Sequence, residues 1–165
     1  MNKPARDAAR ESFVERFGGI YEHSAWVAEQ CFDAAVDSGL DEIAEIFARC
    51  VDAAGSDRKL ALIRAHPDLA GRAAVRGELT EESTDEQASA GIDQCTQSEY
   101  EQFVAFNSAY KDKFGFPFVM AVRGSNRHKI LAAFAERIEN DRDTEFTTAI
   151  RQIHKIARLR LESMK

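Results

Sequence analysis

The sequence has few of the residues that interrupt helices or build covalent and metal sites. Three Pro and nine Gly occur among 165 residues, so obligatory breaks are rare. The cysteines are odd in number and stand far apart, at Cys31, Cys50 and Cys95. Disulfide frameworks and zinc sites need closer, paired spacing, which excludes both as the basis of the fold. We expect three reduced thiols in a reducing compartment.

Long apolar runs and address signals are also missing. No apolar run approaches the roughly 18 residues that a membrane-spanning helix needs. The first residues lack the apolar core of a secretory signal peptide. Residues 162–165 read Glu-Ser-Met-Lys, unlike the Ser-Lys-Leu address of peroxisomal proteins. We therefore expect a cytoplasmic protein that does not enter a membrane.

Basic charge and ligand motifs are scarce as well. The formal net charge is -6, and proteins that bind nucleic acid depend on neutralising phosphates, so no nucleic-acid partner is expected. A small anionic substrate remains compatible with this charge, because a pocket can be basic inside an acidic protein. The sequence contains no HExxH, calcium-loop, Walker or GxGxxG motif. We therefore predict no metal site from the histidines His23, His66, His128 and His154.

What the chain does have is an ordinary globular composition with helical periodicity. Hydrophobic residues make up 44% and charged residues 30% of it, and its length fits one domain, residues 1–165. Apolar residues recur at i, i+3, i+4 and i+7 almost everywhere. We predict an all-α, single-domain helical bundle of about seven to eight helices with one irregular segment. The helices are expected at about 6–16, after Ser24, at 41–54, at 56–66, from 83 or 84, between Thr96 and Gly115, and at 126–140 and 144–164.

The irregular segment begins at His66. Pro67 disfavours helical backbone at the residue before it, so the preceding helix must end near His66. A corner residue can aim its imidazole into a cleft and titrate near neutral pH, which suits acid–base catalysis. A histidine at a helix C-terminus can also simply complement the helix dipole. The residues alone favour this second, structural role.

The helix after the irregular segment has two candidate starts. The pairs Ser83–Glu86 and Thr84–Gln87 both have capping-box spacing. On spacing alone, Glu86 is interpreted as the capping-box acceptor. Residues 116–122 form a later apolar run that contains Pro117 and is too short for a helix. We expect a buried extended segment there, which is either ordinary core or a pocket wall that offers backbone N–H and C=O groups to a ligand.

Arg160 is unusual for its position on the last predicted helix. A helical wheel places it inside the apolar stripe, whereas Arg158 falls outside. A guanidinium directed into a core is costly unless it is paired or hydrogen-bonded. Arg160 therefore extends to solvent, pairs with a buried carboxylate or holds an anionic ligand. The stripe consists of Phe146, Ile150, Ile153, Ala157, Leu161 and Met164.

Several motifs, in order along nearly the whole chain, resemble the 2-oxo-4-hydroxy-4-carboxy-5-ureidoimidazoline (OHCU) decarboxylase family of urate degradation. No single motif is decisive, but their combination and order over one domain length are specific. They are Gly18-Gly19-Ile20-Tyr21-Glu22-His23-Ser24, His66-Pro67-Asp68-Leu69-Ala70-Gly71, Ser83-Thr84-Asp85-Glu86-Gln87 with Ala90-Gly91, Phe114-Gly115-Phe116-Pro117-Phe118-Val119 with Arg123-Gly124, and Ile153-His154-Lys155-Ile156-Ala157-Arg158-Leu159-Arg160-Leu161.

The resemblance implies an all-α homodimer that uses no metal or organic cofactor. It implies decarboxylation of a small anionic ureidoimidazoline to (S)-allantoin, with His66 as the general acid. Glu86 and Arg160 would assist catalysis, and Glu86 would either orient His66 or bind substrate. The implied substrate contacts are Pro67, Ser83, Thr84, Asp85, Glu86, Gln87, Phe118, Val119, Met120, Ala121, Val122 and Arg160.

Two other functions fit parts of the sequence. A non-catalytic helical binding or regulatory module would account for the helices and the acidic surface. It would not account for an arginine in an apolar stripe together with His66 and Glu86 at matching positions. A metal-dependent hydrolase would lose its activity to a chelator, whereas a cofactor-independent decarboxylase would keep it.

Overall fold

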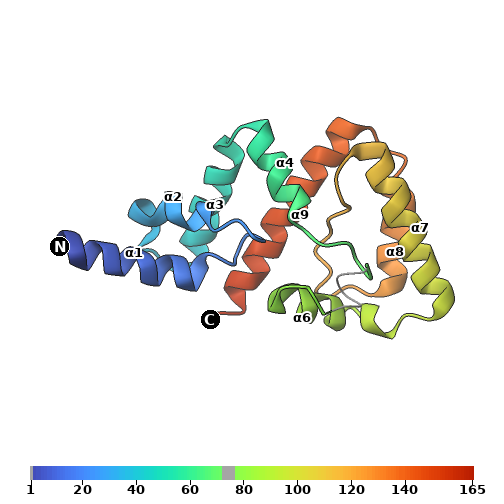
Figure 1. Ribbon diagram of the computed structural model, residues 1–165, viewed down its shortest axis with the longest axis horizontal. Coiled ribbons are helices and arrows are strands. Elements are labelled where there is room, and N and C mark those ends of the chain that lie inside the picture. Colours follow the sequence, from blue (N-terminus) through green and yellow to red (C-terminus); the bar gives the residue numbers. More distant parts are fainter. Residues whose placement is uncertain (1, 72–76) are drawn as a thin grey trace. The chain divides into compact units, whose positions relative to one another are not determined.

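The computed structural model describes residues 2–71 and 77–165. These residues form eight α-helices and one short 3-10 helix, η1, with no strand among them (Figure 1). The predicted all-α class is therefore confirmed. The elements are α1 (Lys3–Phe17), α2 (Trp26–Ala35), α3 (Leu40–Ala53), α4 (Ser56–Arg64), α6 (Glu81–Ser89), η1 (Ile92–Gln94), α7 (Gln97–Phe114), α8 (Arg127–Arg137) and α9 (Arg142–Glu162).

The chain divides into two compact units. Unit 1 comprises the residues up to Ala65 together with His154–Lys165, and unit 2 comprises His66–Ile153. The first part of α9 therefore belongs to unit 2 and its last turns belong to unit 1. The assignment of residues 1–165 to a single domain stays a prediction.

Unit 1 is built around an aromatic core. Its α2 packs against both α1 and α3. Phe47 of α3 is fully buried, and the rings of Phe13, Phe17 and Tyr21 lie 6.2, 6.5 and 6.3 Å from it. Aromatic side chains supply large apolar areas, so this cluster accounts for much of the packing free energy of the unit. The three cysteines of the chain are free thiols.

Unit 2 has its own aromatic core, between α7, α8 and the extended run 116–122. The Phe118 ring stacks on Phe134 of α8 at 3.7 Å, and Tyr110 of α7 meets Phe118 edge-on at 5.4 Å. The run is non-helical, and its residues are buried except for Met120, which is half-buried. The expected buried extended segment is thus confirmed, and its phenylalanine side chains pack as core.

Helix ends follow the local sequence where one capping signal is clear. At Thr96, the predicted start of α7, Thr96 and Glu99 form a capping box. Gly115 ends the same helix with φ 77°, a left-handed conformation that glycine adopts without a side-chain clash. Both ends of α7 were therefore predictable from short-range chemistry.

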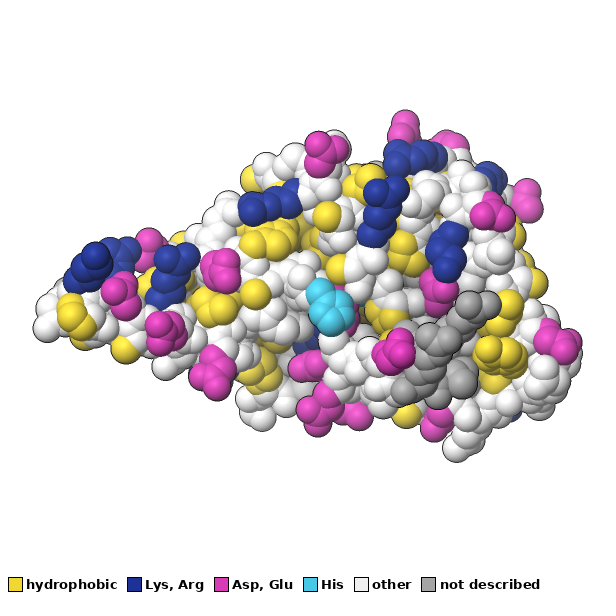
Figure 2. Space-filling model, viewed as in Figure 1, with side chains coloured by type: hydrophobic (Ala, Val, Ile, Leu, Met, Phe, Trp, Pro, Cys, Tyr) yellow, Lys and Arg dark blue, Asp and Glu magenta, His cyan; other side chains and the backbone are white. Residues whose placement is uncertain are grey.

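The surface carries mixed charge. Figure 2 shows acidic and basic side chains interspersed over the face in view, in keeping with the net charge of -6. Among the described residues, the large hydrophobic side chains that remain exposed are Val36 and Val104. Within the same residues, no helix has both the length and the apolar character that a membrane span requires.

A buried polar cluster lies under the run 116–122. Glu145 of α9 is fully buried and accepts hydrogen bonds from Tyr110 Oη, from Arg137 Nε at 2.8 Å and from Asn140 Nδ2 at 3.0 Å. Arg137 Nη1 also donates to the carbonyl of Val119 at 2.7 Å. The charge of Glu145 thus holds the guanidinium that fixes the run.

We expect Glu145→Ala to lower the free energy of unfolding by about 3–5 kcal/mol, because it leaves the charge of Arg137, whose side chain is only 11% exposed, without its carboxylate. Urea unfolding measures this change. Glu136→Ala, which removes an exposed carboxylate from α8, is the control and should stay within about 0.5 kcal/mol of the parent protein. Equal destabilisation by the two variants would contradict the role given to Glu145.

Candidate active site

His66 lies at the corner that follows α4. The helix stops at Arg64 and Ala65 caps it, which confirms the helix end predicted from Pro67. His66 is only 8% exposed. A histidine that merely complements a helix dipole has no need to leave solvent, and burying an imidazole costs free energy unless its nitrogens are hydrogen-bonded. Burial therefore favours a role for His66 inside unit 2 over simple helix capping.

Gln87 of α6 holds the backbone that follows His66. Its Oε1 accepts a hydrogen bond from the Ala70 N–H at 3.1 Å, and its Nε2 donates to the Asp68 carbonyl at 3.3 Å. Ala70 has φ 54°, a left-handed conformation that costs a residue with a side chain about 1–2 kcal/mol. The amide of Gln87 therefore stabilises a corner that the backbone alone would not favour.

Helix α7 holds the same corner from another side. Asn107 Nδ2 donates to the Leu69 carbonyl at 2.8 Å, and Asn107 is almost fully buried. Lys111, one turn further along α7, forms an ion pair with Asp68 at 2.6 Å. The corner after His66 is thus fixed by side chains from two helices rather than by its own backbone.

The start of α6 differs from the prediction. The N-cap is Thr80, whose hydroxyl accepts a hydrogen bond from the Ser83 N–H, so the helix begins at Glu81 and not at residues 83–84. The earlier start also places two acidic residues in the first turn, where the helix dipole favours them. Glu86 is therefore not a capping-box acceptor, and that interpretation was wrong.

The predicted substrate contacts on α6 have different environments. Ser83 and Gln87 are buried, Glu86 is half-buried, and Thr84 and Asp85 are exposed. Residues 83 and 87 lie one helical turn apart, so they share the face that meets the corner. Of the two acidic residues in this set, Asp85 is exposed and Glu86 is half-buried.

The run 118–122 presents a defined set of backbone groups. The Val119 carbonyl is bonded to Arg137, and the Ala121 N–H donates to Gln152 Oε1 at 3.0 Å. Because a trans peptide points its C=O and N–H in opposite directions, the N–H of Met120 points away from Arg137, and the Met120 carbonyl points away from Gln152. Met120 therefore lies between two peptides that side chains of α8 and α9 anchor.

Helix α7 connects the corner and the run. Asn107 bonds to Leu69, and Tyr110, three residues later, packs against Phe118. Residues three apart lie on neighbouring positions of one helix face. Three of the predicted segments, namely 66–71, 83–87 and 118–122, are thus attached to a common frame in unit 2.

Arg160 belongs to unit 1 and is buried, as the helical wheel predicts, whereas Arg158 is exposed. Its Nη2 donates to Glu22 Oε2 at 2.7 Å, and its Nη1 donates to the Gly19 carbonyl at 3.1 Å. Of the three alternatives for a guanidinium in an apolar stripe, the structure therefore contains the buried carboxylate partner.

The segment that carries Glu22 makes a second contact with α9. Tyr21 Oη lies 2.8 Å from His154 Nδ1, and His154 Nε2 lies 2.8 Å from Asp52 Oδ1. Burial raises the pKa of the Tyr21 phenol, and the Asp52 charge raises it further. Tyr21 therefore keeps its proton, and its hydroxyl stays within hydrogen-bond distance of His154.

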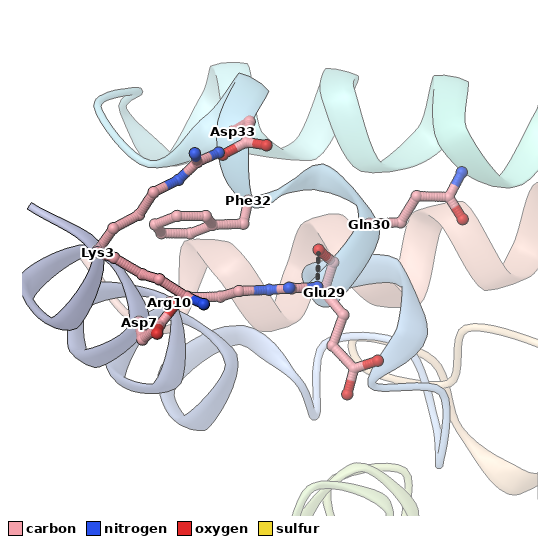
Figure 3. A pocket seen from close by; sticks show the side chains of 8 residues that line it. Lys3, Asp7, Arg10, Glu29, Gln30, Phe32 and Asp33 are labelled. Carbon is pink, nitrogen blue, oxygen red and sulfur yellow. Dashed lines mark hydrogen bonds and ion pairs between the residues drawn. The ribbon is translucent and has the colours of Figure 1, made fainter.

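Two cavities among the described residues are lined by none of the predicted site residues. One, of about 610 Å³, lies between α1 and α2, where Arg10 donates to the Glu29 carbonyl (Figure 3). The other, of about 570 Å³, adjoins the corner 68–71 and one face of α7. The described lining residues of both cavities include none of the predicted catalytic or substrate-binding residues. The first is lined by Lys3, Arg6, Asp7, Arg10, Glu29, Gln30, Phe32 and Asp33, and the second by Asp68, Gly71, Tyr100, Val104, Asn107, Ser108, Lys111 and Asp112.

Sequence reasoning missed the residues that hold others in place. Glu22, Asn107 and Gln152 were not proposed for any function, yet each bonds to a predicted site residue or its segment. Glu22 lies within a motif of the resemblance, which was the available signal. The partners of Asn107 and Gln152 are backbone groups 38 and 31 residues away, and no local pattern encodes such pairs.

Comparison with known proteins gives a consistent result. The OHCU decarboxylase family model matches residues 6–162. The chain is 46% identical over 151 residues to a 2-oxo-4-hydroxy-4-carboxy-5-ureidoimidazoline decarboxylase of Haloferax volcanii, covering 92% of this chain and 88% of that protein. It is 42% identical over 157 residues to the decarboxylase of the same name from Halalkalicoccus jeotgali, covering 95% and 87%.

A solved structure agrees with these relatives. The crystal structure of an (S)-allantoin synthase superposes with a TM-score of 0.73 at 34% identity, over 93% of this chain. This chain spans 50% of the length of that one. Because the family model covers nearly the whole sequence and relatives of similar length exceed 40% identity, this chain belongs to the OHCU decarboxylase family.

Proposed function

We propose that this chain decarboxylates OHCU to (S)-allantoin and carbon dioxide in urate degradation. Family membership over residues 6–162 is the observation that carries the proposal. The arrangement of unit 2 supports it, because a buried histidine stands at a corner that side chains of α6 and α7 hold. A non-catalytic binding module would not require a buried, rigidly placed imidazole.

The reaction needs no cofactor in principle, because the substrate contains its own electron sink. When the bond between the ring carbon and the carboxyl carbon breaks, its electron pair moves toward the neighbouring imine and carbon dioxide leaves. The imine nitrogen that receives the electron pair gains a proton, and the resulting enol-like intermediate then loses its hydroxyl proton and gains a proton on carbon, so that one proton is consumed overall. The protein has to hold the carboxylate, stabilise the intermediate and deliver that proton to one face.

His66 is the proposed donor of that proton. Imidazole changes its charge near neutral pH, so it can give up and recover a proton at little cost in each cycle. Pro67 ends α4 next to His66. It therefore fixes the position of the backbone from which the imidazole extends. Glu86, half-buried on α6 of the same unit, either orients His66 or binds the substrate.

The run 118–122 is the proposed wall for the ring and the ureido group. The N–H of Met120 points away from Arg137 and its carbonyl points away from Gln152, and these two side chains hold the neighbouring peptides. One donor and one acceptor on a single residue match a –NH–C(=O)– group, of which the substrate has several. Thr84 and Asp85, exposed on α6, and Ser83 and Gln87, buried there, are the remaining proposed contacts.

Arg160 is the proposed partner of the substrate's negative charge. A guanidinium presents its donors in a rigid plane that matches a carboxylate. The bonds to Glu22 and Gly19 fix the orientation of that plane within unit 1.

We also propose that the protein is a cytoplasmic homodimer. The family resemblance supports the dimer, and three free cysteines support a reducing compartment.

We expect purified protein, dialysed against EDTA, to accelerate the loss of OHCU and to yield one enantiomer of allantoin. The substrate supplies its own electron sink, and its unaided decay gives racemic product, so stereocontrol reports catalysis. Ultraviolet absorbance follows the rate and circular dichroism follows the enantiomer. Racemic product formed at the background rate would overturn the enzymatic function, and activity that requires added metal would overturn the cofactor-independent mechanism.

His66→Asn should lower kcat by about a hundredfold or more, the usual contribution of a general acid, while the melting temperature changes little. His128→Asn is the matched control, because His128 is an exposed histidine at the start of α8. Steady-state kinetics and thermal melting are measured on both variants. Normal turnover in His66→Asn would return His66 to a structural role.

Arg160→Ala should lose most activity and also lower the free energy of unfolding by about 3–5 kcal/mol, because it leaves Glu22 buried without its cation. Arg160→Lys separates the two effects. It keeps the charge, so it should melt near the parent temperature, but loss of the planar grip should reduce kcat/KM by about tenfold or more. Arg158→Ala, on the exposed face of α9, should match the parent in both measurements. Parent kinetics in Arg160→Lys would remove Arg160 from the substrate site.

A further inference from the structure

Glu22 is a buried carboxylate that the proposed chemistry does not use. It is 1% exposed, and its Oε2 lies 2.7 Å from Arg160 Nη2. Acidic side chains are almost never fully buried unless a cation or several donors compensate the lost hydration. The pair therefore represents a specific arrangement rather than a surface contact.

The turn around Glu22 has a backbone that directs this side chain inward. His23 has φ 46°, a left-handed conformation that is unusual for a residue with a side chain. The turn is held by bonds of Ser24, whose hydroxyl donates to the Glu22 carbonyl at 2.8 Å and whose N–H donates to the Tyr21 carbonyl at 3.1 Å. As a result, the side chain of His23 lies in solvent and that of Glu22 lies in the interior. A strained backbone conformation that surrounding hydrogen bonds hold in place is typical of segments near functional sites.

Attachment of this turn to α9 does not depend on the ion pair alone. Tyr21 already joins the turn to His154 of α9, and Asp52 of α3 holds His154. Replacing a buried ion pair by apolar residues of similar volume is often neutral or stabilising, so packing by itself does not favour Glu22 over an apolar residue. The additional ion pair costs free energy to bury. It is better explained by its effect on the orientation of the Arg160 guanidinium.

We infer that Glu22 is a positioning residue, which fixes the guanidinium of Arg160 in the orientation that binds the substrate carboxylate. Arginine has a long side chain with several rotatable bonds, and binding would otherwise have to order it. Glu22 takes Nη2 while the Gly19 carbonyl takes Nη1, so two different nitrogens are held and the plane of the group is set. This inference rests on the proposed function of Arg160.

The test is a double-mutant cycle with steady-state kinetics and thermal melting. Glu22→Gln keeps the shape and an acceptor oxygen but removes the charge. It should reduce kcat/KM by about tenfold, mainly by raising KM, because a less ordered guanidinium weakens carboxylate binding. In an Arg160→Lys background the same change should alter kcat/KM by less than about twofold, since residues that act through one another are not additive.

A shorter carboxylate keeps the test decisive if Glu22→Gln does not fold. Glu22→Asp retains the charge that Arg160 needs in the interior but moves it back by one methylene, so it should fold and still lower kcat/KM. Asp52→Asn is the matched control, because it weakens the other attachment of the same turn, through His154, without touching Arg160. It should leave kcat/KM unchanged.

The outcomes separate this inference from the proposed function. Parent kcat/KM in Glu22→Gln or Glu22→Asp, beside a fall in Arg160→Lys, would overturn the positioning role and leave the role of Arg160 intact. Parent kinetics in Arg160→Lys itself would overturn both. Fully additive losses in the cycle would mean that Glu22 acts independently of Arg160, which also contradicts the inference.

Discussion

Buried backbone outside a helix has to find hydrogen-bond partners, and this constraint governs the irregular parts of the molecule. An all-α chain satisfies most of its backbone groups within helices, but three irregular segments, each of which is at least partly buried, cannot do so. In each of them a helix supplies a polar side chain. Gln87 and Asn107 hold the corner after His66, Arg137 and Gln152 hold the run around Met120, and Arg160 holds the turn at Gly19.

Two of these side chains solve the problem in the same way. Arg137 pairs with Glu145 and donates to the Val119 carbonyl, while Arg160 pairs with Glu22 and donates to the Gly19 carbonyl. In both, the carboxylate compensates a guanidinium that is largely removed from solvent, and the guanidinium fixes an irregular segment. The difference lies in where the carboxylate stands. Glu145 is on a helix and also holds Tyr110 and Asn140, whereas Glu22 is on the irregular turn itself.

Structural features that depend on residues close together in the sequence could be predicted, whereas contacts between residues far apart in the sequence could not. The ends of α7 were predictable because Thr96, Glu99 and Gly115 act on their own neighbours. Burial of Arg160 was predictable because one helix defines its own stripe. The predicted start of α6 was wrong. Thr80, Ser83 and Thr84 can all cap a helix, and the local sequence does not determine which of them does so. The partners Glu22 and Arg160 are 138 residues apart, and periodicity carries no information over such a distance.

The same constraint bears on how the proposed decarboxylation would reach a single enantiomer. A proton reaches one face of a planar intermediate only if its donor cannot move to the other. Gln87 fixes α6 against the backbone of Asp68 and Ala70, and so it fixes Glu86, its neighbour on that helix, relative to the corner that carries His66. Asn107 fixes that corner relative to α7, and Tyr110 of α7 packs on Phe118 at the start of the run. The bonds that satisfy buried backbone in unit 2 are therefore also the bonds that set the relative positions of the proposed acid, its acidic neighbour and the proposed substrate wall.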